Sequence, residues 1–150
     1  AGVGAVSDAE IQAELESVAR DLRVQRATLR LKSDESVFPI AYEHCEPGTH
    51  SIRDTPRLDM SKQPVVLKMQ AGASQVVEDD CNVATDDPGY HEMRAMFGGM
   101  QAQIVTANRD ADGEIIGLLS VHDLTAPRAW TEAEAARARA AADRLDELTR

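Results

Sequence analysis

One stretch of the sequence decides the fold, and it reads Ile104-Val105-Thr106-Ala107-Asn108-Arg109-Asp110-Ala111-Asp112-Gly113-Glu114-Ile115-Ile116-Gly117-Leu118-Leu119-Ser120-Val121-His122. Its middle, Asp110 to Gly113, is a turn sequence, because aspartate and glycine accept the backbone angles of tight turns. The flanking residues 101–108 and 114–122 have the length and composition of strands. They predict an antiparallel hairpin. The second strand is so apolar that we expect it at the centre of a sheet.

Three more strands are predicted before this hairpin. Residues 27–32 alternate between apolar and polar side chains, which is typical of a half-buried strand. A polar turn at 33–36 leads into a strand over residues 37–45, and residues 74–78 form a short strand of their own. Pro39 has no N–H to donate, so its strand is expected at an edge of the sheet. Period-two spacing places four side chains of that strand on one face: Phe38, Ile40, Tyr42 and His44.

Helices are predicted at both ends of the chain and in its middle. Ser7 and Glu10 have the spacing of a capping box, and the apolar stripe behind them predicts a helix over residues 8–23. Shorter helices follow Ser61 and Asp86 or Asp87, each with a proline near its start. The last helix follows the capping box of Thr131 and Glu134 and runs nearly to Arg150. Its expected seam is Ala133, Ala136, Ala140, Leu145 and Leu148.

Composition excludes several classes of partner. The chain has 150 residues and a net charge of -10, which repels nucleic-acid phosphates and anionic membranes. No apolar stretch approaches the roughly 20 residues that span a bilayer. Cys45 and Cys81 are too few for a disulfide framework, so we expect two thiols in a reducing, cytoplasmic setting. We expect residues 1–7 to be a disordered lead-in or a remnant of cloning, and residues 8–150 to be a single domain.

The order of these elements resembles the GAF domain, a sensor fold related to PAS. The resemblance rests on the hairpin with Asp112-Gly113-Glu114-Ile115-Ile116-Gly117, on Pro127-Arg128-Ala129-Trp130-Thr131-Glu132, and on the segment from Pro64 to Asp79. It implies an α+β fold with a central antiparallel sheet of five to six strands. Terminal helices would cover one face of this sheet, and a lid of short helices and loops would cover the other.

The resemblance also implies a function. GAF domains bind cyclic nucleotides, tetrapyrroles, small acids or metals, and they pass the signal through terminal helices that often form a dimer. We therefore expect a sensor that binds a small polar or anionic molecule between sheet and lid, with a homodimer as a further possibility. The cofactor is unknown from the sequence. The cyclic-nucleotide motif of the family is absent, and no cysteine stands where a bilin would attach.

Two other functions stay open. A minority of the family reduces free methionine sulfoxide, which needs a nucleophilic thiol and a resolving thiol. Cys81 lies near the position of the family's cysteine, but its companion is absent and Cys45 would have to replace it. The other alternative is a dimerisation module with a vestigial pocket. The scattered set of His44, Cys45, His50, Cys81 and His91 has no metal-site spacing, so no metal is expected.

The candidate ligand-binding residues are polar side chains on otherwise apolar surfaces. They offer hydrogen-bond donors and acceptors to a small ligand, and His122 can change its charge near neutral pH. Arg53 and Arg57, in the lid loop, could close over an anion. No catalytic residue is expected. The predicted ligand-binding set is Tyr42, His44, Asp80, Cys81, Tyr90, Gln101, Gln103, Ser120 and His122.

Overall fold

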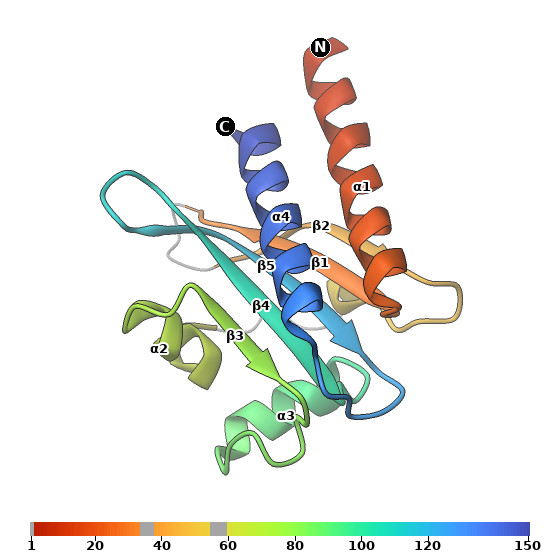
Figure 1. Cartoon of the computed structure of the whole chain (residues 1–150), viewed down its shortest axis with the longest axis vertical. Coiled ribbons are helices and arrows are strands. Elements are labelled where there is room, and N and C mark those ends of the chain that lie inside the picture. The colour runs from red at the N-terminus through yellow and green to blue at the C-terminus, as the bar shows by residue number, and fades with distance from the viewer. Residues whose placement is uncertain (1, 34–37, 55–59) are drawn as a thin grey trace.

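A computed structural model describes residues 2–33, 38–54 and 60–150 of the chain. Five strands form one antiparallel sheet in the order β2-β1-β5-β4-β3 (Figure 1). The predicted fold class is confirmed, and so are the central place of the last strand and the edge position of the strand after Pro39. The strands are β1 (Arg26–Leu31), β2 (Ile40–Cys45), β3 (Gln75–Glu78), β4 (Ala102–Arg109) and β5 (Ile115–Asp123).

The β4–β5 hairpin forms as its sequence predicts. The side chain of Asp110 accepts hydrogen bonds from the backbone N–H groups of Asp112 and Glu114, both at 2.9 Å. Gly113 has a φ of 82°, a left-handed angle that residues with a Cβ rarely adopt. Hydrogen bonds within the turn and the backbone freedom of Gly113 therefore fix its shape. The predicted turn at 33–36 falls almost wholly outside the described residues.

Helices α1 (Gly2–Leu22) and α4 (Glu132–Thr149) lie side by side on one face of the sheet (Figure 1). The capping box of Thr131 and Glu134 is present at the start of α4. Helix α1 begins at Gly2 rather than at residue 8, so Ser7 lies inside it. A capping sequence favours a helix start, but it does not prevent the preceding residues from extending the helix.

The face of α4 that packs differs from the predicted seam. Ala133, Ala136 and Ala140 are exposed, and of the predicted residues only Leu145 is fully buried. Alanines are so frequent in this helix that its composition does not mark one face. Docking against α1 and β4 selects the buried residues, which are Ala138, Ala141, Ala142 and Leu145.

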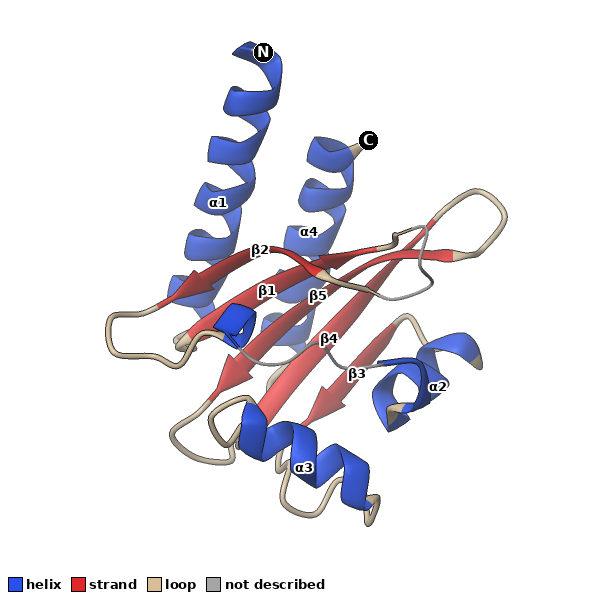
Figure 2. Cartoon of the chain, turned by 180° about the vertical axis from the view of Figure 1, so that it is seen from behind, coloured by secondary structure: helices blue, strands red, loops and turns tan. Residues whose placement is uncertain are grey.

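The opposite face of the sheet carries a lid layer, which we define as residues 46–54, 60–74 and 79–100. It contains α2 (Pro64–Gln70), α3 (Pro88–Met96) and two short 3-10 helices, Ile52–Asp54 and Met60–Lys62 (Figure 2). Asp87 caps α3, as predicted, by accepting a hydrogen bond from the N–H of Tyr90 at 2.8 Å. The sheet thus separates two apolar cores, one under each layer.

A bulge in β2 overturns the prediction that Phe38, Ile40, Tyr42 and His44 share a face. Leu29 pairs with Tyr42 and the next residue, Arg30, pairs with Ile40, so Ala41 is an extra residue. An extra residue reverses the side-chain alternation. Phe38 and Ile40 therefore pack under the lid layer, whereas Tyr42 packs on the helix side.

Candidate functional site

A row of side chains crosses the face of the sheet that lies under the lid layer. Cys45 pairs with Arg26, Arg26 with His122, His122 with Gln103, and Gln103 with Glu78. Directly opposed residues in neighbouring strands point to the same face, so these five side chains form one line. Four of them carry polar or charged groups that are buried, which is unusual for the middle of a sheet.

His122 is held as a neutral imidazole in this row. The Nε group of Arg26 donates to Nδ1 of His122 at 2.9 Å, so the ring proton lies on Nε2. Burial is the main cause that lowers the pKa of His122 well below its usual value, and the charges of Arg26 and Arg30 add to the effect. Nε2 makes no hydrogen bond within the described residues, which leaves it as a donor.

Glu78, the last residue of the row, accepts hydrogen bonds from two side chains. Its Oε1 atom accepts from Nε2 of Gln103 at 2.6 Å and from the hydroxyl of Tyr90 at 2.7 Å. Burial raises the pKa of Tyr90 far above its usual value, and hydrogen bonds with Cys81 and Glu78 raise it further. Tyr90 is therefore a neutral donor. Glu78 is a buried carboxylate stabilised by neutral groups.

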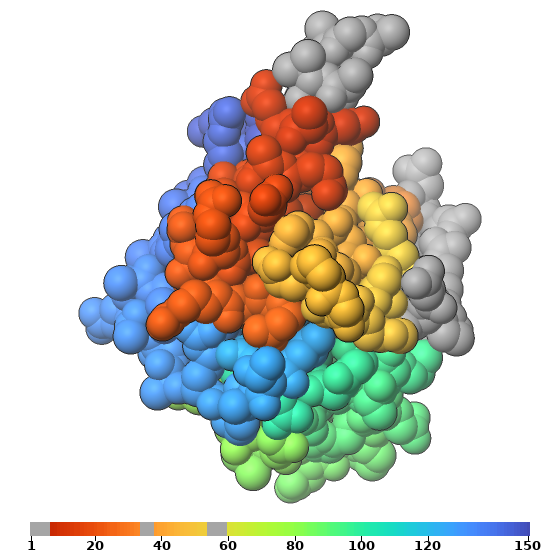
Figure 3. Space-filling model, turned by 90° about the vertical axis from the view of Figure 1, so that its right-hand side faces the viewer, coloured from red at the N-terminus to blue at the C-terminus, as the bar shows by residue number. Residues whose placement is uncertain are grey.

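Next to this row, a cavity of about 40 Å³ lies between the sheet and the lid layer. That volume holds roughly three water molecules. Most of its wall is apolar and comes from α2, α3, β4 and β5. On the side shown in Figure 3, the segment after β2 (gold) fills the space between α1 (red) and α3 (green). The polar side chains of the cavity wall are Thr28, Arg30, Gln63, Gln103, Ser120 and His122.

Arg30 brings a positive charge to the cavity without an ion pair. Its Nη1 group donates to the carbonyl of Phe38 at 2.7 Å, and its guanidinium carbon lies 5.9 Å from the centre of the Phe97 ring. Burial lowers the pKa of Arg30 to about 10, and the charge of Glu43 opposes that shift. Arg30 stays charged at neutral pH. Within the described residues, no carboxylate lies within 4.0 Å of it.

Glu43, the acid whose charge acts on Arg30, makes its hydrogen bonds with other groups. Both carboxylate oxygens of Glu43 accept hydrogen bonds in the lid layer, from the hydroxyl of Ser51 at 2.5 Å and from the N–H of Ile52 at 2.8 Å. Gln63 presents the opposite polarity on the lid side of the cavity. Its Oε1 atom is buried and has no hydrogen-bond partner among the residues that the structure describes. The cavity thus has unused donors on the sheet, and the unpaired Oε1 atom of Gln63 lies in the lid layer beside it.

The structure brings three predicted ligand-binding residues to the cavity wall: Gln103, Ser120 and His122. Tyr90 does not line the wall. Its hydroxyl donates to Glu78, which also accepts from Gln103 of the wall. Each of these residues lies on a strand or helix that faces the lid side. Their spacing in the sequence was therefore sufficient to group them.

Three others, Asp80, Cys81 and Gln101, lie beyond the end of β3 and outside the cavity wall. Asp80 accepts from the N–H of Asn82 at 2.9 Å, and Gln101 accepts from the side chain of Asn82 at 3.0 Å. Cys81 is fully buried, and burial raises its pKa to about 11. These residues shape a loop rather than the cavity.

Tyr42 and His44 are on the wrong face of the sheet because of the bulge. The hydroxyl of Tyr42 donates to Asp8 of α1 at 2.5 Å. Nε2 of His44 lies 3.3 Å from a carboxylate oxygen of Glu46. Arg53 is exposed and donates to the carbonyl of Ala41 at 2.5 Å. Arg57, the other predicted anion contact, lies outside the described residues.

Sequence reasoning missed the residues that matter most to the cavity, Thr28 and Arg30, together with the neighbouring Arg26. These three alternate with Ala27, Leu29 and Leu31 along β1. The alternation was visible, but it suggested a polar face in water. Strand β1 lies between β2 and β5 and is covered on both sides, so Arg26 and Thr28 are buried and Arg30 is half-buried.

The two thiols are far apart. Cys45 lies in one edge strand and Cys81 follows the other, and four strand spacings separate these edges by roughly 19 Å. Within the described residues neither cysteine forms a disulfide, and neither lines the cavity. Cys45 is therefore not placed to resolve an intermediate on Cys81. In the described part of the chain, no three His, Cys, Asp or Glu side chains are grouped to hold a metal.

Comparison with known proteins identifies the family and the fold. The family model of the GAF domain matches residues 8–146. The chain is similar in structure to the cyanobacteriochrome receptor PixJ, with a TM-score of 0.78, 19% identity, and coverage of 99% of this chain and 98% of that one. No curated protein matches the sequence. Within the described residues, no helix has the length and apolar character needed to cross a membrane.

Two further solved structures are similar. One is the blue-light-absorbing form of the PixJ GAF domain of Thermosynechococcus elongatus, with a TM-score of 0.77 and 17% identity over 98% of this chain and 89% of that one. The other is the far-red-absorbing dark state of JSC1_58120g3 with bound biliverdin IXa. It has a TM-score of 0.70 and 21% identity over 90% of this chain and 84% of that one. At these identities the likeness shows a shared fold.

Proposed function

The chain belongs to the GAF domain family, and on that premise we propose that it is a sensory module for a small polar or anionic molecule. The ligand binds in the cavity between the sheet and the lid layer. The observation that carries this proposal is Arg30, a charged side chain that faces the cavity without an ion pair. Arg30 is half-buried, and a charge that is partly removed from water is stabilised by a partner of opposite sign, so a bound anionic ligand is a suitable partner.

A bilin is a second candidate, because one similar structure contains biliverdin. Two features of this chain weigh against it. The cavity volume of about 40 Å³ is many times too small for a tetrapyrrole, and the more open hollow of about 430 Å³ that adjoins it at Val66 and Leu118 has no cysteine in its wall. Neither Cys45 nor Cys81 lines the wall, so no thiol is available for attachment there. We therefore expect no stable coloured complex when the purified protein is mixed with biliverdin, as measured by visible absorption after gel filtration.

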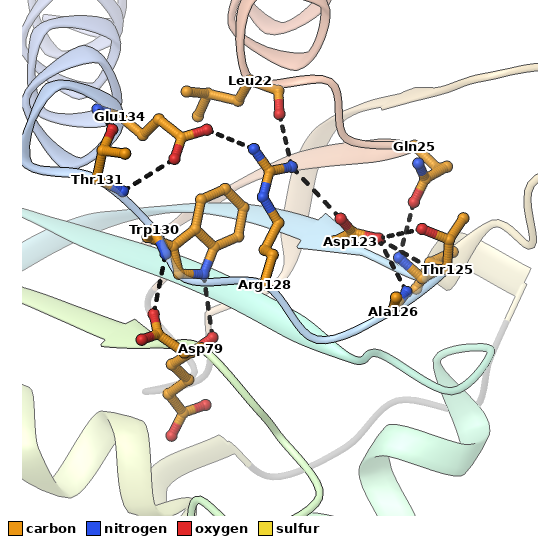
Figure 4. A network of polar contacts seen from close by, with 12 residues as sticks. Leu22, Gln25, Asp79, Asp123, Thr125, Ala126, Arg128, Trp130, Thr131 and Glu134 are labelled. Carbon is orange, nitrogen blue, oxygen red and sulfur yellow. Dashed lines mark hydrogen bonds and ion pairs between the residues drawn. The ribbon is translucent and has the colours of Figure 1, made fainter.

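The proposed output is through α1 and α4, and a cluster of contacts supports it (Figure 4). The indole N–H of Trp130 donates to the carbonyl of Glu78 at 3.1 Å, so the residue that ends the buried row is tied to the segment before α4. Arg128 stacks on Trp130, with its guanidinium carbon 4.1 Å from the ring centre. The same guanidinium donates to the carbonyl of Leu22, the last residue of α1, at 2.8 Å and pairs with Glu134 in the first turn of α4.

This cluster gives a physical route for coupling. A ligand that shifts the Gln103–Glu78 contact also shifts the carbonyl that holds Trp130, and with it the ends of both helices. Coupling of this kind is reciprocal, so a change in helix packing also changes the affinity for the ligand. We propose further that the helix pair carries the signal by forming a homodimer.

A panel of small metabolites, tested by thermal shift, examines the proposed function. We expect at least one small polar compound to raise Tm in the native protein, because ligands that bind only the folded state stabilise it. Replacing Ser120 by Leu fills the cavity and should abolish the shift. Tyr42→Phe, on the other face of the sheet, is the matched control and should keep it. A flat response to every compound would instead favour a dimerisation module with a vestigial pocket.

A further inference from the structure

The unused polar groups on the sheet side of the cavity are donors around a positive charge. Arg30 supplies the charge, and the Nε2–H group of His122 supplies a neutral donor. Thr28 and Ser120, which are directly paired across β1 and β5, add two hydroxyls. Within the described residues none of these hydroxyls has a hydrogen-bond partner. Gln103 uses one of its two N–H donors on Glu78.

This arrangement selects for a ligand with a negative head group. Arginine binds carboxylates through two parallel hydrogen bonds, and hydroxyl and imidazole donors can saturate the remaining lone pairs. A ligand with a cationic group would be repelled, because Arg26 and Arg30 both lie close enough to act on His122 in the cavity wall. A zwitterion is disfavoured for the same reason.

The remaining wall restricts the size and polarity of the rest of the ligand. The cavity has room for roughly three waters, so it favours a very small molecule of only a few non-hydrogen atoms. Val65, Val66, Met93, Phe97 and Leu118 face this space, so a short aliphatic segment fits better than a second charged group.

Gln63 adds one specific requirement. Its buried Oε1 atom lacks a partner and lies at the start of α2, on the lid side of the cavity. Leaving a buried acceptor unpaired is costly, so a ligand that donates a hydrogen bond to it gains affinity. The donor has to be uncharged in a site that already holds cations. A hydroxyl group fits this description.

From these features we infer that the cavity is a receptor for a short hydroxycarboxylate, a molecule of the size of lactate or glycolate. This inference rests on the proposed sensory function and names its ligand class. The carboxylate is bound by Arg30 with Thr28, Ser120 and His122. The hydroxyl donates to Gln63 and the carbon chain packs on the apolar wall.

Isothermal titration of the whole chain with four probes tests the inference: lactate, propionate, lactamide and inorganic phosphate. We expect lactate to bind most tightly, propionate more weakly, and lactamide and phosphate not measurably. Arg30→Met should weaken lactate binding by roughly ten- to a hundredfold, as expected for the loss of hydrogen bonds to a charged group. Arg53→Met removes an exposed arginine outside the cavity, and it should leave the affinity within about twofold.

Two more variants keep the result interpretable. If Arg30→Met does not fold, as judged by circular dichroism, Arg30→Lys keeps the charge without the planar fork and should bind lactate more weakly than the native protein does. Gln63→Leu should reduce lactate affinity to that of propionate and leave propionate unchanged. That pattern separates the hydroxyl contact from the carboxylate contact.

The outcomes also separate this inference from the proposed function. Equal binding of lactamide and lactate, or phosphate binding tighter than lactate, would overturn the carboxylate class while leaving a sensor of small polar molecules. Equal binding of propionate and lactate would overturn the role of Gln63 and the hydroxyl. If no compound of this set or of the wider metabolite panel binds the native protein, both proposals fail.

Discussion

Several residues under the lid layer are polar and buried, and their side chains form hydrogen bonds with one another. Glu78 keeps its position through two neutral donors, Tyr90 and Gln103, instead of a cation. His122 is kept neutral by burial beside Arg26. Such groups are costly when one partner is lost, because the other is left unpaired in a poorly solvated place. Stability measurements on conservative variants can therefore test the network atom by atom.

Replacing Tyr90 by Phe removes one hydroxyl with little change in volume. We expect the free energy of unfolding to fall by about 1.5–3 kcal/mol, because the lost hydrogen bond reaches the Glu78 carboxylate. Tyr42→Phe is the control, since the hydroxyl of Tyr42 reaches Asp8 in an exposed position, and it should cost about 0.5 kcal/mol or less. Urea unfolding measures both. Equal losses in the two variants would contradict the network at Glu78.

The depressed pKa of His122 predicts a pH dependence of stability. In the folded state its pKa lies well below 6.5, whereas the unfolded chain takes up the proton near 6.5. Stability from this group is therefore complete above about pH 6.5 and is lost as the pH falls, with a slope of up to about 1.4 kcal/mol per pH unit. Urea unfolding at pH 7.5, 6.5 and 5.5 tests the slope. His122→Gln should flatten it, and an unchanged slope in this variant would assign the effect to other groups.

At the scale of elements, the contacts at one corner of the fold connect parts that are distant in sequence. Arg128 joins the last carbonyl of α1, the end of β5 at Asp123 and the first turn of α4 (Figure 4). Its side chain is 17% exposed, so these contacts are largely shielded from solvent. Arg144 also pairs with acids, Glu10 and Glu147, but its side chain is 51% exposed.

This difference in exposure predicts different costs for the same substitution. Arg128→Gln should lower the free energy of unfolding by about 2–4 kcal/mol, because it leaves Asp123 and Glu134 without their cation. Arg144→Gln should change it by about 0.5 kcal/mol or less. Thermal and urea unfolding measure both. A small effect of Arg128→Gln would remove this residue from the proposed route between the cavity and the helices.

At the scale of the whole molecule, the surface of the helix layer is relevant to the proposed homodimer. Ala133, Ala136 and Ala140 recur along α4 and are exposed rather than packed on the sheet. Small side chains allow a second helix to approach closely. The outward surface is otherwise rich in charge, and the chain has a net charge of -10. The alanine stripe is therefore the contact that we propose for the homodimer.

We expect the purified chain to have twice the 16.3 kDa mass of one copy in light scattering. Ala136→Glu places a charge in the stripe and should shift the mass to that of one chain. Ala111→Glu, in the exposed β4–β5 turn, is the control and should leave the mass unchanged. A single-chain mass for the native protein at all concentrations would exclude signalling by a homodimer of this chain.

The sequence by itself determined the local elements and the family. The Asp110–Gly113 turn, the capping box of Thr131 and Glu134, the cap at Asp87 and the strand periodicity each depend on residues close together in the chain. Gln103, Ser120 and His122 were found in the same way, because their strands contain no bulge between them. Features that depend only on neighbouring residues, such as turns, caps and strand periodicity, can therefore be predicted from the sequence.

Only the tertiary structure decided which face each side chain reaches and what covers it. The bulge at Ala41 moved Tyr42 and His44 away from the cavity, and nothing in the local pattern marks that extra residue. Arg26 and Thr28 became buried, and Arg30 half-buried, only because β1 is an interior strand with a layer on each side. Burial is a property of the neighbours that fold over a residue, and those neighbours are far away in the sequence.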